Sequence, residues 1–291
     1  MKKFILLLLF LTSTIASAET VWVLHSAKPG GNSGKMNYAL AGELEKNGHQ
    51  TKHEFVNGCR GIQQWLVNNP KAPAVFDFQV VEDITKDVDP SNDQACDVGF
   101  NKNSVLAISV KASLKFCAMT DTAINQWLNE KAPVKIGYHR VVPGSQIMAE
   151  GVAKEINPNS RFVHIKGGAQ LAQALVSGDI DIGAVSYSAN LEQAGAKCYV
   201  ETDLVSAKNT PYKIKQLNPT TKWKDAGQIS VWVGHNVPMA EFRKYAITVV
   251  NTHPDILKNI KLGAERDGVA VGKTVDQQWT ILSLYKNQFR K

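Results

Sequence analysis

The chain has 291 residues, of which 44% are hydrophobic and 20% are charged, and its formal net charge is +7. This length suits about two compact domains, and the apolar content excludes a disordered chain. The 21 glycines and 11 prolines are ordinary for a globular protein. Without a run of about five like charges, the sequence argues against a nucleic-acid-binding groove, and its mildly basic character suits small anionic ligands.

The first 18 residues predict a secretory signal peptide. Lys2 and Lys3 supply the positive start, residues 4–11 form an unbroken apolar run, and Ala16-Ser17-Ala18 fits a cleavage site of small residues. We expect cleavage after Ala18 and export to the periplasm. No later segment approaches the roughly 18 consecutive apolar residues of a membrane span, so we expect the mature protein to be soluble.

The four cysteines Cys59, Cys96, Cys117 and Cys198 predict two disulfide bonds. An even number of cysteines in an exported protein favours structural bridges over a catalytic thiol. Their spacing fits neither a zinc-binding motif nor a redox-active CxxC motif. Four cysteines allow three pairings, and the spacing alone does not choose among them.

The first part of the chain alternates strand-like and helix-like patterns. Short apolar runs predict strands at residues 21–24, 51–56, 74–78, 105–110 and 114–119. The helical spacing of apolar residues from Met36 to Leu44, with Gly48 as a stop signal, predicts the first helix, and residues 61–69 predict a second. Residues 82–103 are polar and rich in turn formers, which predicts a loop.

The second part of the chain has a more regular pattern. Strands are predicted at residues 134–138, 161–165 and 180–185, with helices at residues 143–156 and 168–176 between them. This βαβαβ order requires a parallel sheet with helices on both faces. A further strand is predicted at 198–205, and helices are predicted at 238–251, 254–262 and 274–288. We therefore predict two α/β lobes joined by short connections.

Three glycine-containing turns, each between a strand and a helix, are the candidate binding loops. They occupy residues 28–34, 143–146 and 166–169. Glycine lets backbone N–H groups approach an anion, a helix start adds partial positive charge, and ligands of open α/β sheets bind beyond the carboxyl ends of the strands. The first turn is not a nucleotide-binding loop, because Gly30 and Gly34 are too close and Met36 replaces the magnesium-binding hydroxyl. The alternative for each turn is an ordinary strand-to-helix connection.

Other groups of side chains give weaker signals. His49 and His53 have the spacing of a metal-binding pair, but they fall on a predicted turn and strand rather than on one helical face. Neither Ser145 nor Ser186 lies in a GxSxG motif, and no Ser/His/Asp set stands out. We therefore expect no metal site, no cofactor and no catalytic residues.

Several segments, taken in order, resemble the receptor proteins of the tripartite tricarboxylate transporters. Pro29-Gly30-Gly31-Asn32-Ser33 and Asn57-Gly58-Cys59-Arg60-Gly61 are similar to two glycine loops of that family. The similarity continues at Pro143-Gly144-Ser145, at residues 164–170 and 177–181, and at residues 217–220, which an apolar segment ending at residues 236–238 follows. The resemblance spans most of the mature chain. The chain departs from the family at Gly34, where an aspartate is usual.

The resemblance implies a two-lobed α/β fold, the class II periplasmic-binding-protein fold. In that fold each lobe is a mainly parallel sheet flanked by helices, and two crossing strands form the hinge, here near residues 115–119 and 197–200. Lobe 1 would comprise residues 19–118 together with residues 200–291, and lobe 2 would comprise residues 119–199. The same fold implies a Cys117–Cys198 disulfide between the crossing strands and a Cys59–Cys96 disulfide within lobe 1.

The resemblance also implies that the chain is an exported receptor and not an enzyme. Such a receptor, here expected to be a monomer, captures a small carboxylate in the cleft between the lobes and delivers it to a membrane permease. The implied ligand-binding residues are Pro29, Gly30, Gly31, Asn32, Ser33, Gly58, Arg60, Arg140, Gly144, Ser145, Gln146, Lys166, Gly167, Gly168 and Asp181.

Four of these side chains have an alternative role besides contact with the carboxylate. Arg60, Arg140 and Lys166 either contact the anion or are ordinary exposed cations, as arginine and lysine usually are. Asp181 either holds an amine or hydroxyl group of the solute or orients the backbone of residues 166–169. Two other functions stay open: a binding protein that serves a sensor kinase or another class of transporter, and an exported hydrolase, which the missing nucleophile motif disfavours.

Overall fold

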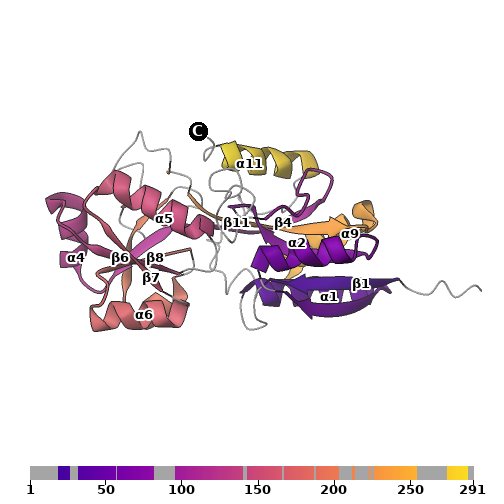
Figure 1. Ribbon diagram of the computed structural model, residues 1–291, viewed down its shortest axis with the longest axis horizontal. Helices are drawn as coiled ribbons and strands as arrows, with labels where there is room; N and C mark the ends of the chain where they lie inside the picture. The colour runs from indigo at the N-terminus through magenta and orange to yellow at the C-terminus, as the bar shows by residue number, and fades with distance from the viewer. Residues whose placement is uncertain are drawn as a thin grey trace, which may run out of the picture.

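The computed structural model describes residues 19–26, 32–56, 58–81, 96–139, 143–165, 167–186, 188–202, 212–213, 223, 226–253 and 274–287. The predicted signal peptide, residues 1–18, and the helix predicted at 254–262 lie outside the described residues. Figure 1 shows two bodies side by side, each built from a β-sheet with helices on its faces. Among the described residues, no helix is both long enough and apolar enough to cross a membrane.

Within the described residues, the first sheet, called sheet 1 here, has five strands in the order β2-β1-β3-β11-β4. They are β2 (Gln50–Phe55), β1 (Thr20–His25), β3 (Ala74–Gln79), β11 (Gly227–His235) and β4 (Val105–Ser113). β1 is parallel to β2 and β3, whereas β11 is antiparallel to both β3 and β4. β3 and β11 lie inside the sheet and are buried on both faces, which is why they read as nearly continuous apolar runs.

The second sheet, called sheet 2, has six strands in the described part of the chain, in the order β10-β9-β5-β8-β6-β7. They are β10 (Tyr212–Lys213), β9 (Lys197–Glu201), β5 (Lys115–Ala118), β8 (Ile182–Val185), β6 (Lys135–His139) and β7 (Arg161–Ile165). β6, β7 and β8 are mutually parallel, as the βαβαβ pattern predicts, and β5 runs antiparallel to β8 and β9.

Helices cover both sheets. Those that pack around sheet 1 are α1 (Asn32–Lys46), α2 (Gly58–Asn68), α9 (Met239–Thr252) and α11 (Val275–Asn287). Those around sheet 2 are α4 (Asp121–Asn125), the π-helical turn η1 (Gln126–Glu130), α5 (Pro143–Ile156), α6 (Gly168–Ser177) and α7 (Ala189–Gln193). Figure 1 shows α1 and α2 on opposite faces of sheet 1, and α5 and α6 on opposite faces of sheet 2.

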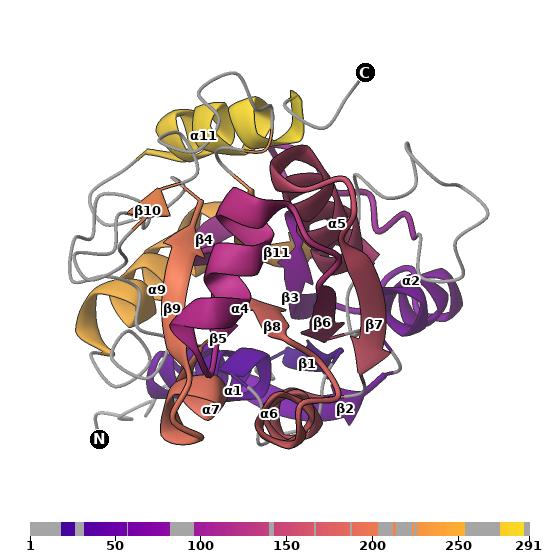
Figure 2. The same cartoon turned by 90° about the vertical axis from the view of Figure 1, so that its left-hand side faces the viewer.

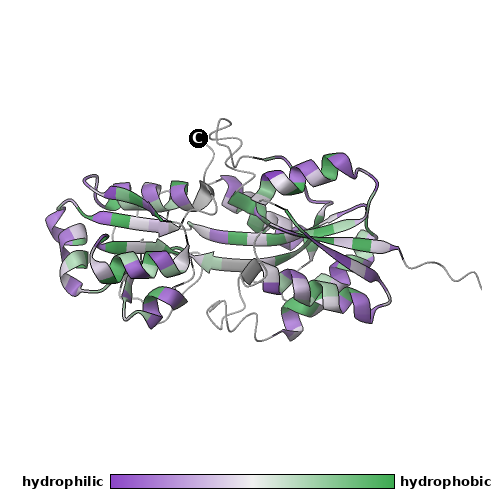
Figure 3. Ribbon diagram, turned by 60° about the horizontal axis from the view of Figure 1, so that its bottom comes forward, coloured by the Kyte–Doolittle hydropathy of each residue, from purple (hydrophilic) through white to green (hydrophobic). Residues whose placement is uncertain are grey.

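Hydrophobic residues concentrate along the strands and on the helix faces that meet them, while the outward faces are hydrophilic (Figure 3). The largest fully buried side chains include Trp232, Phe76 and Phe78 in sheet 1 and Phe116 and Trp127 in the other body. Burial of apolar surface at about 25 cal/mol per Å² is therefore the main stabilising contribution in both bodies.

The two sheets are joined by chain segments that bond to one another. β4 continues through Leu114 into β5, while Thr202 follows β9 and Ala226 precedes β11. Leu114 N donates to Thr202 Oγ1 at 3.0 Å, and Thr202 N donates to Leu114 O at 3.0 Å. Thr202 Oγ1 also donates to Ala226 O. The crossing therefore lies at Leu114 and Thr202, next to the predicted positions, because β5 and β9 are already paired strands of sheet 2.

Both predicted disulfide bonds are confirmed. Cys117 and Cys198 face each other on the neighbouring strands β5 and β9, and they are bonded. Cys59, in the first turn of α2, is bonded to Cys96, with 6.0 Å between the Cα atoms. No free cysteine occurs among the described residues.

Candidate functional site at the facing ends of the two sheets

The strand directions in sheet 1 decide which end of that sheet faces sheet 2. β4 leads through Leu114 into sheet 2, so its carboxyl end lies at the edge nearest that sheet. β4 and β3 are both antiparallel to β11, and β3 is parallel to β1, which is parallel to β2. All four strands therefore end at the edge of sheet 1 that faces sheet 2.

The strand directions in sheet 2 likewise decide which of its ends faces sheet 1. β5 enters sheet 2 from the crossing, so its amino end lies at the edge nearest sheet 1. β8 is antiparallel to β5, and β6 and β7 are parallel to β8. The carboxyl ends of β6, β7 and β8 therefore face sheet 1. Figure 1 shows these strands running from the outer end of their body toward the other body.

Four helices begin directly beyond these facing carboxyl ends. α1 follows β1, α2 follows β2, α5 follows β6 and α6 follows β7. A helix start leaves its first N–H groups without partners inside the helix and carries about half a positive charge, so it attracts anions. The fold thus directs anion-attracting backbone groups from both bodies toward one shared region, where ligands of open α/β sheets bind.

The start of α6 has the geometry of a close backbone approach. Gly167, the residue before the helix, has a φ angle of 111°, which residues with a side chain rarely adopt. A Cβ atom there would meet Gln170 Oε1, and one on Gly168 would come within 2.7 Å of Asn190 Nδ2. Gly167 is the N-cap residue of α6 and provides no side-chain capping hydrogen bond. Both glycines are therefore required, because the side chains of Gln170 and Asn190 pack directly against the start of α6.

The start of α2 is held tightly against the end of β2. Gly58 has a φ angle of 63°, and Gly58 N donates to Val56 O at 3.1 Å. A Cβ atom on Gly61 would lie 3.0 Å from Val56 Cβ, so a larger residue there would force Val56 to shift. Arg60 is exposed in the first turn, beside the Cys59–Cys96 bridge. The disulfide that interrupts the glycine loop therefore fixes the helix start in place.

A polar network supports the start of α5. Gln146 Nε2 donates to Glu150 Oε1 at 2.9 Å, and the hydroxyl of Tyr138 donates to the same oxygen at 3.2 Å. Lys154 Nζ lies 3.5 Å from Glu150 Oε2. The carboxylate of Glu150, one helical turn away, therefore fixes the orientation of the Gln146 side-chain amide.

Most of the predicted ligand-binding residues lie in the described part of the chain, and five lie outside it. Gly58, Arg60, Gln146, Gly167 and Gly168 lie at the facing ends, in the first turns of α2, α5 and α6 or directly before them. Asn32, Ser33, Gly144 and Ser145 are among the first residues of α1 and α5. The predicted residues that lie outside the described part of the chain are Pro29, Gly30, Gly31, Arg140 and Lys166.

Asp181 lies apart from the other predicted residues. It precedes β8, at the amino end of that strand, and its backbone N–H donates to Lys135 O at 2.9 Å. Its Oδ2 accepts a hydrogen bond from Lys135 N at 2.7 Å, at the start of β6. These contacts place it at the end of sheet 2 remote from sheet 1. The carboxylate joins two strand starts there and does not orient the backbone of residues 166–169.

A cluster of four rings at the facing end of sheet 1 did not emerge from the sequence. His25 ends β1 and Phe55 ends β2, and their rings stack with centroids 4.7 Å apart. His53 stacks on Tyr38 of α1 with centroids 4.5 Å apart. His25 Nε2 and His53 Nδ1 lie 2.8 Å apart and share a hydrogen bond that joins the two stacked pairs.

Burial keeps this histidine pair uncharged. Only 1% of His25 is exposed, and burial together with the neighbouring His53 lowers the pKa of His25 to about 4. Burial also lowers the pKa of His53, although the carboxylate of Glu45 acts in the opposite direction. His49 belongs elsewhere, because its Nε2 lies 3.6 Å from Glu241 Oε1. His49 and His53 therefore face different partners.

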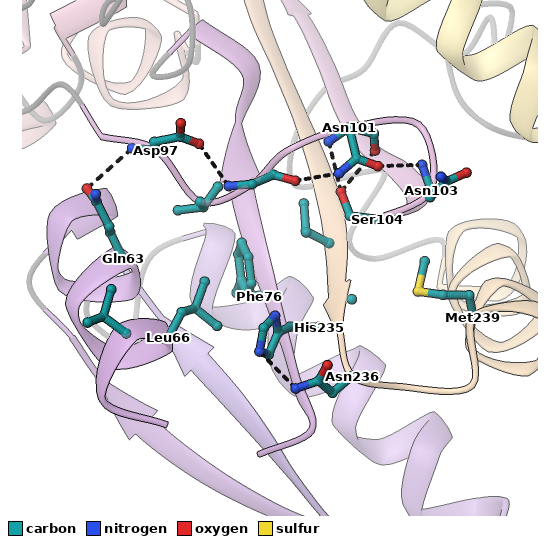
Figure 4. Close-up of a pocket in the computed structure, with 15 residues that line it drawn as sticks. Gln63, Leu66, Phe76, Asp97, Asn101, Asn103, Ser104, His235, Asn236 and Met239 are labelled. Carbon is teal, nitrogen blue, oxygen red and sulfur yellow. Dashed lines mark hydrogen bonds between the residues drawn. The ribbon is translucent and has the colours of Figure 1, made fainter. Parts of the chain in front are cut away.

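A cavity of about 490 Å³ lies at the other end of sheet 1. His235 contributes to its lining and pairs with Ala74, the first residue of β3, so the cavity is remote from sheet 2. Figure 4 shows its polar groups bonded to one another: Gln63 Oε1 accepts from Asp97 N, and Asn236 Nδ2 lies 3.0 Å from His235 Nε2. Its described lining contains no lysine or arginine, so this cavity does not suit a carboxylate.

Comparison with known proteins places this fold among solute-binding proteins. No family model and no curated protein matches the sequence. The periplasmic binding protein BugD aligns with a TM-score of 0.60 at 13% identity, over 93% of this chain and 94% of that chain. The TctC solute-binding protein from Polaromonas aligns with a TM-score of 0.58 at 14% identity, over 94% and 98%. MatC from Rhodopseudomonas palustris, solved with bound malate, gives a TM-score of 0.57 at 13% identity, over 94% and 97%.

These structures are the kind of receptor that the sequence motifs resemble, and they match this chain over nearly its whole length. The similarity confirms the predicted fold, two lobes with mainly parallel sheets flanked by helices and joined by crossing strands. The chain therefore has the fold of the periplasmic solute-binding proteins.

Proposed function

We propose that the chain is an extracytoplasmic receptor that captures a small carboxylate between its two lobes and delivers it to a tripartite tricarboxylate-type permease. The single observation that carries this proposal is the direction of the strands. β1, β2, β6 and β7 all end at the facing edges, so the starts of α1, α2, α5 and α6 converge on one region. Convergent N–H groups from two bodies suit a ligand with negatively charged oxygen atoms.

The strength of such a site follows from its hydrogen bonds. Each charge-assisted bond between a backbone N–H group and a carboxylate contributes about 1.5–3 kcal/mol. A few of them, reduced by the loss of ligand freedom, give an affinity near 1 μM, or about −8 kcal/mol. Contacts from both lobes favour the closed arrangement, because only that arrangement makes all of them at once.

The similar structures support the choice of ligand class. MatC was solved with malate, and another aligned protein, Rpa4515 from R. palustris, was solved with adipate. Both ligands are small dicarboxylates. We propose the same class for this chain, with Pro29, Gly30, Gly31, Arg140 and Lys166 completing the site. We also propose that the chain acts without catalysis, as the aligned proteins are binding proteins rather than enzymes.

The proposal also covers export, the oligomeric state and the boundaries of the two lobes. Residues 1–18 direct export to the periplasm and are removed after Ala18, and the mature receptor is a monomer. The expected lobes, residues 19–118 with 200–291 and residues 119–199, need shifted boundaries, because β5, β9 and β10 all belong to sheet 2. We propose that the lobes divide at the crossing near Leu114 and Thr202.

The test is thermal and chemical unfolding of the mature chain against a panel of mono-, di- and tricarboxylates. A ligand present at 100 times its dissociation constant raises the free energy of unfolding by about 2.7 kcal/mol. A Ser145→Glu variant places a negative charge at the start of α5, where it favours the helix but repels a carboxylate. The control is Gln173→Glu, on an exposed position of α6.

We expect both variants to fold and only Ser145→Glu to lose the stabilisation by the carboxylate. The proposal fails if no member of the panel stabilises the wild-type chain, or if Ser145→Glu binds as tightly as Gln173→Glu. Turnover of simple esters by the wild-type chain would instead favour the hydrolase alternative.

A further inference from the structure

The histidine pair lies at or near the carboxyl ends of β1 and β2. His25 is the last residue of β1, and Ser26 alone separates it from the segment 27–31 that leads into α1. The backbone oxygen of His25 accepts a hydrogen bond from Val56 N at 2.9 Å, which ties the ends of β1 and β2 together. The pair therefore belongs to the edge of sheet 1 that faces sheet 2.

The pair can hold one more proton without breaking its hydrogen bond. One N–H proton between His25 Nε2 and His53 Nδ1 satisfies both atoms at 2.8 Å. His25 Nδ1 is buried and has no hydrogen-bond partner among the described residues. Protonation of His25 places a hydrogen on both ring nitrogens. His25 then donates to His53 through a stronger, charge-assisted bond, and Nδ1 becomes a donor with a positive charge.

The other charged groups around the pair already have partners within the described structure. Glu45 of α1 accepts from Thr51 Oγ1 and offsets part of the lowering of the His53 pKa by burial. By strand alternation Asp77 of β3 shares the face of His25, and it accepts from Ser109 Oγ at 2.9 Å. Tyr38 covers the pair from α1. Two further charged residues of β2 turn to the other face, where Lys52 lies over Trp22 and Glu54 accepts from Trp65.

An anion is therefore the new charge that binding brings to this edge. In a partly buried site, a carboxylate within several ångströms favours the charged form of a histidine. By linkage, a ligand that makes proton binding easier is itself bound more tightly when the proton is present.

We propose that the His25–His53 pair takes up a proton when the solute binds, so that the receptor captures the carboxylate together with a proton. The inference rests on the proposed function and deepens it, because it makes two further residues part of the specificity for anionic solutes. Affinity then increases as the pH falls from the pKa of the ligand-bound pair toward the pKa of about 4 in the free chain, by up to about tenfold per pH unit for one linked proton.

Isothermal titration calorimetry tests the inference. The probe is the carboxylate that stabilises the wild-type chain most in the panel, titrated between pH 5.5 and 8 in two buffers that differ in ionisation enthalpy. The difference between the two binding enthalpies gives the number of protons taken up. The variants are His25→Phe and His53→Phe, which keep a ring in the stack. The control is His235→Gln, at the remote end of sheet 1.

We expect wild type and His235→Gln to take up a proton and to bind more tightly at lower pH. We expect whichever histidine variants fold to bind with no uptake and with a flat pH profile. The inference is overturned if the wild-type chain takes up no proton, or if uptake persists in both histidine variants. If no carboxylate binds the wild-type chain at any pH, the proposed function itself has failed, which is a separate outcome.

Discussion

Leu114 and Thr202 exchange two hydrogen bonds at the point where the chain passes between the sheets. Leu114 N donates to Thr202 Oγ1 and Thr202 N donates to Leu114 O, each at 3.0 Å. Both residues are buried, with 2% of Leu114 and none of Thr202 exposed. The two crossing segments are thus joined by a side chain as well as by the backbone.

A Thr202→Val substitution tests this junction. Valine keeps the shape of threonine but removes the closer of two acceptors for Leu114 N and one of two donors to Ala226 O. Leu114 N still donates to Ala226 O at 3.3 Å. The loss of a typical intramolecular hydrogen bond costs about 0.5–1.5 kcal/mol. We expect the free energy of unfolding, measured by urea denaturation, to fall by that amount in Thr202→Val and by much less in Thr202→Ser. Equal stability of wild type and Thr202→Val would show that the hydroxyl contributes nothing.

The two disulfide bonds close loops of different length, with sequence separations of 81 for Cys117–Cys198 and 37 for Cys59–Cys96. Restriction of the unfolded chain predicts about 4.5 kcal/mol for the longer loop and about 4 kcal/mol for the shorter one. We expect each Cys→Ala double variant to lower the free energy of unfolding, with the larger loss at Cys117–Cys198. Non-reducing peptide mapping gives the direct check, and any cross-linked peptide that joins Cys59 to Cys198 contradicts the pairing.

Two helical glycines predict opposite effects of the same substitution. A Cβ atom on Gly151 of α5 would collide with the ring of Trp223, whereas one on Gly42 of α1 meets nothing within 4 Å. We expect Gly42→Ala to stabilise the chain by about 0.5–1 kcal/mol, since alanine loses less entropy in a helix. We expect Gly151→Ala to destabilise it by about 1–3 kcal/mol through overpacking. Midpoints of urea unfolding decide between these outcomes, and similar values for both variants would contradict the packing at Trp223.

Acid should weaken the fold through His25. Its pKa is about 4 in the folded chain and ordinarily about 6.5, so between these values the unfolded chain binds more protons. Stability is therefore complete above pH 6.5, falls as the pH decreases, and levels off near pH 4. The loss from this residue is at most about 3 kcal/mol.

We expect His25→Phe to remove this part of the decrease when unfolding free energies at pH 7 and pH 4.5 are compared without ligand. His235→Gln is the matched control, because it removes a partly exposed histidine far from the pair. An unchanged pH dependence in His25→Phe would place the acid sensitivity elsewhere.

Much of the fold could be predicted because its signals are local. The strands β1, β2, β3, β6 and β7 and the helices that follow β1, β2, β6 and β7 appear as apolar periodicity with glycine between them. β11 was foreseen only as an apolar segment, and its pairing with β3 and β4, which lie more than a hundred residues earlier in the chain, has no local signal. The short α4 and α7 were missed as well, since helices of 5 residues carry too few periodic positions.

The residues of the candidate site also differ in whether a local sequence signal reveals them. Gly58, Gly167 and Gly168 could be found because glycine between a strand and a helix is itself a signal. The His25–His53 pair could not, because its members are 28 residues apart and meet only through the register of β1 and β2. Asp181 looked equivalent to the loop residues in sequence, but strand polarity places it at the opposite end of its sheet.

The order of the strands separates the junction between the sheets from the proposed binding residues. β4 and β5 carry the crossing, whereas β2 lies at the opposite margin of sheet 1 and β7 at the opposite margin of sheet 2. Figure 2, along the long axis, shows β2 and β7 on the side away from β9 and β10. If one lobe turns relative to the other about Leu114 and Thr202, the widest gap opens beside β2 and β7. A solute would then enter next to the starts of α2 and α6, so those two helices would be the first to meet it and the last to release it.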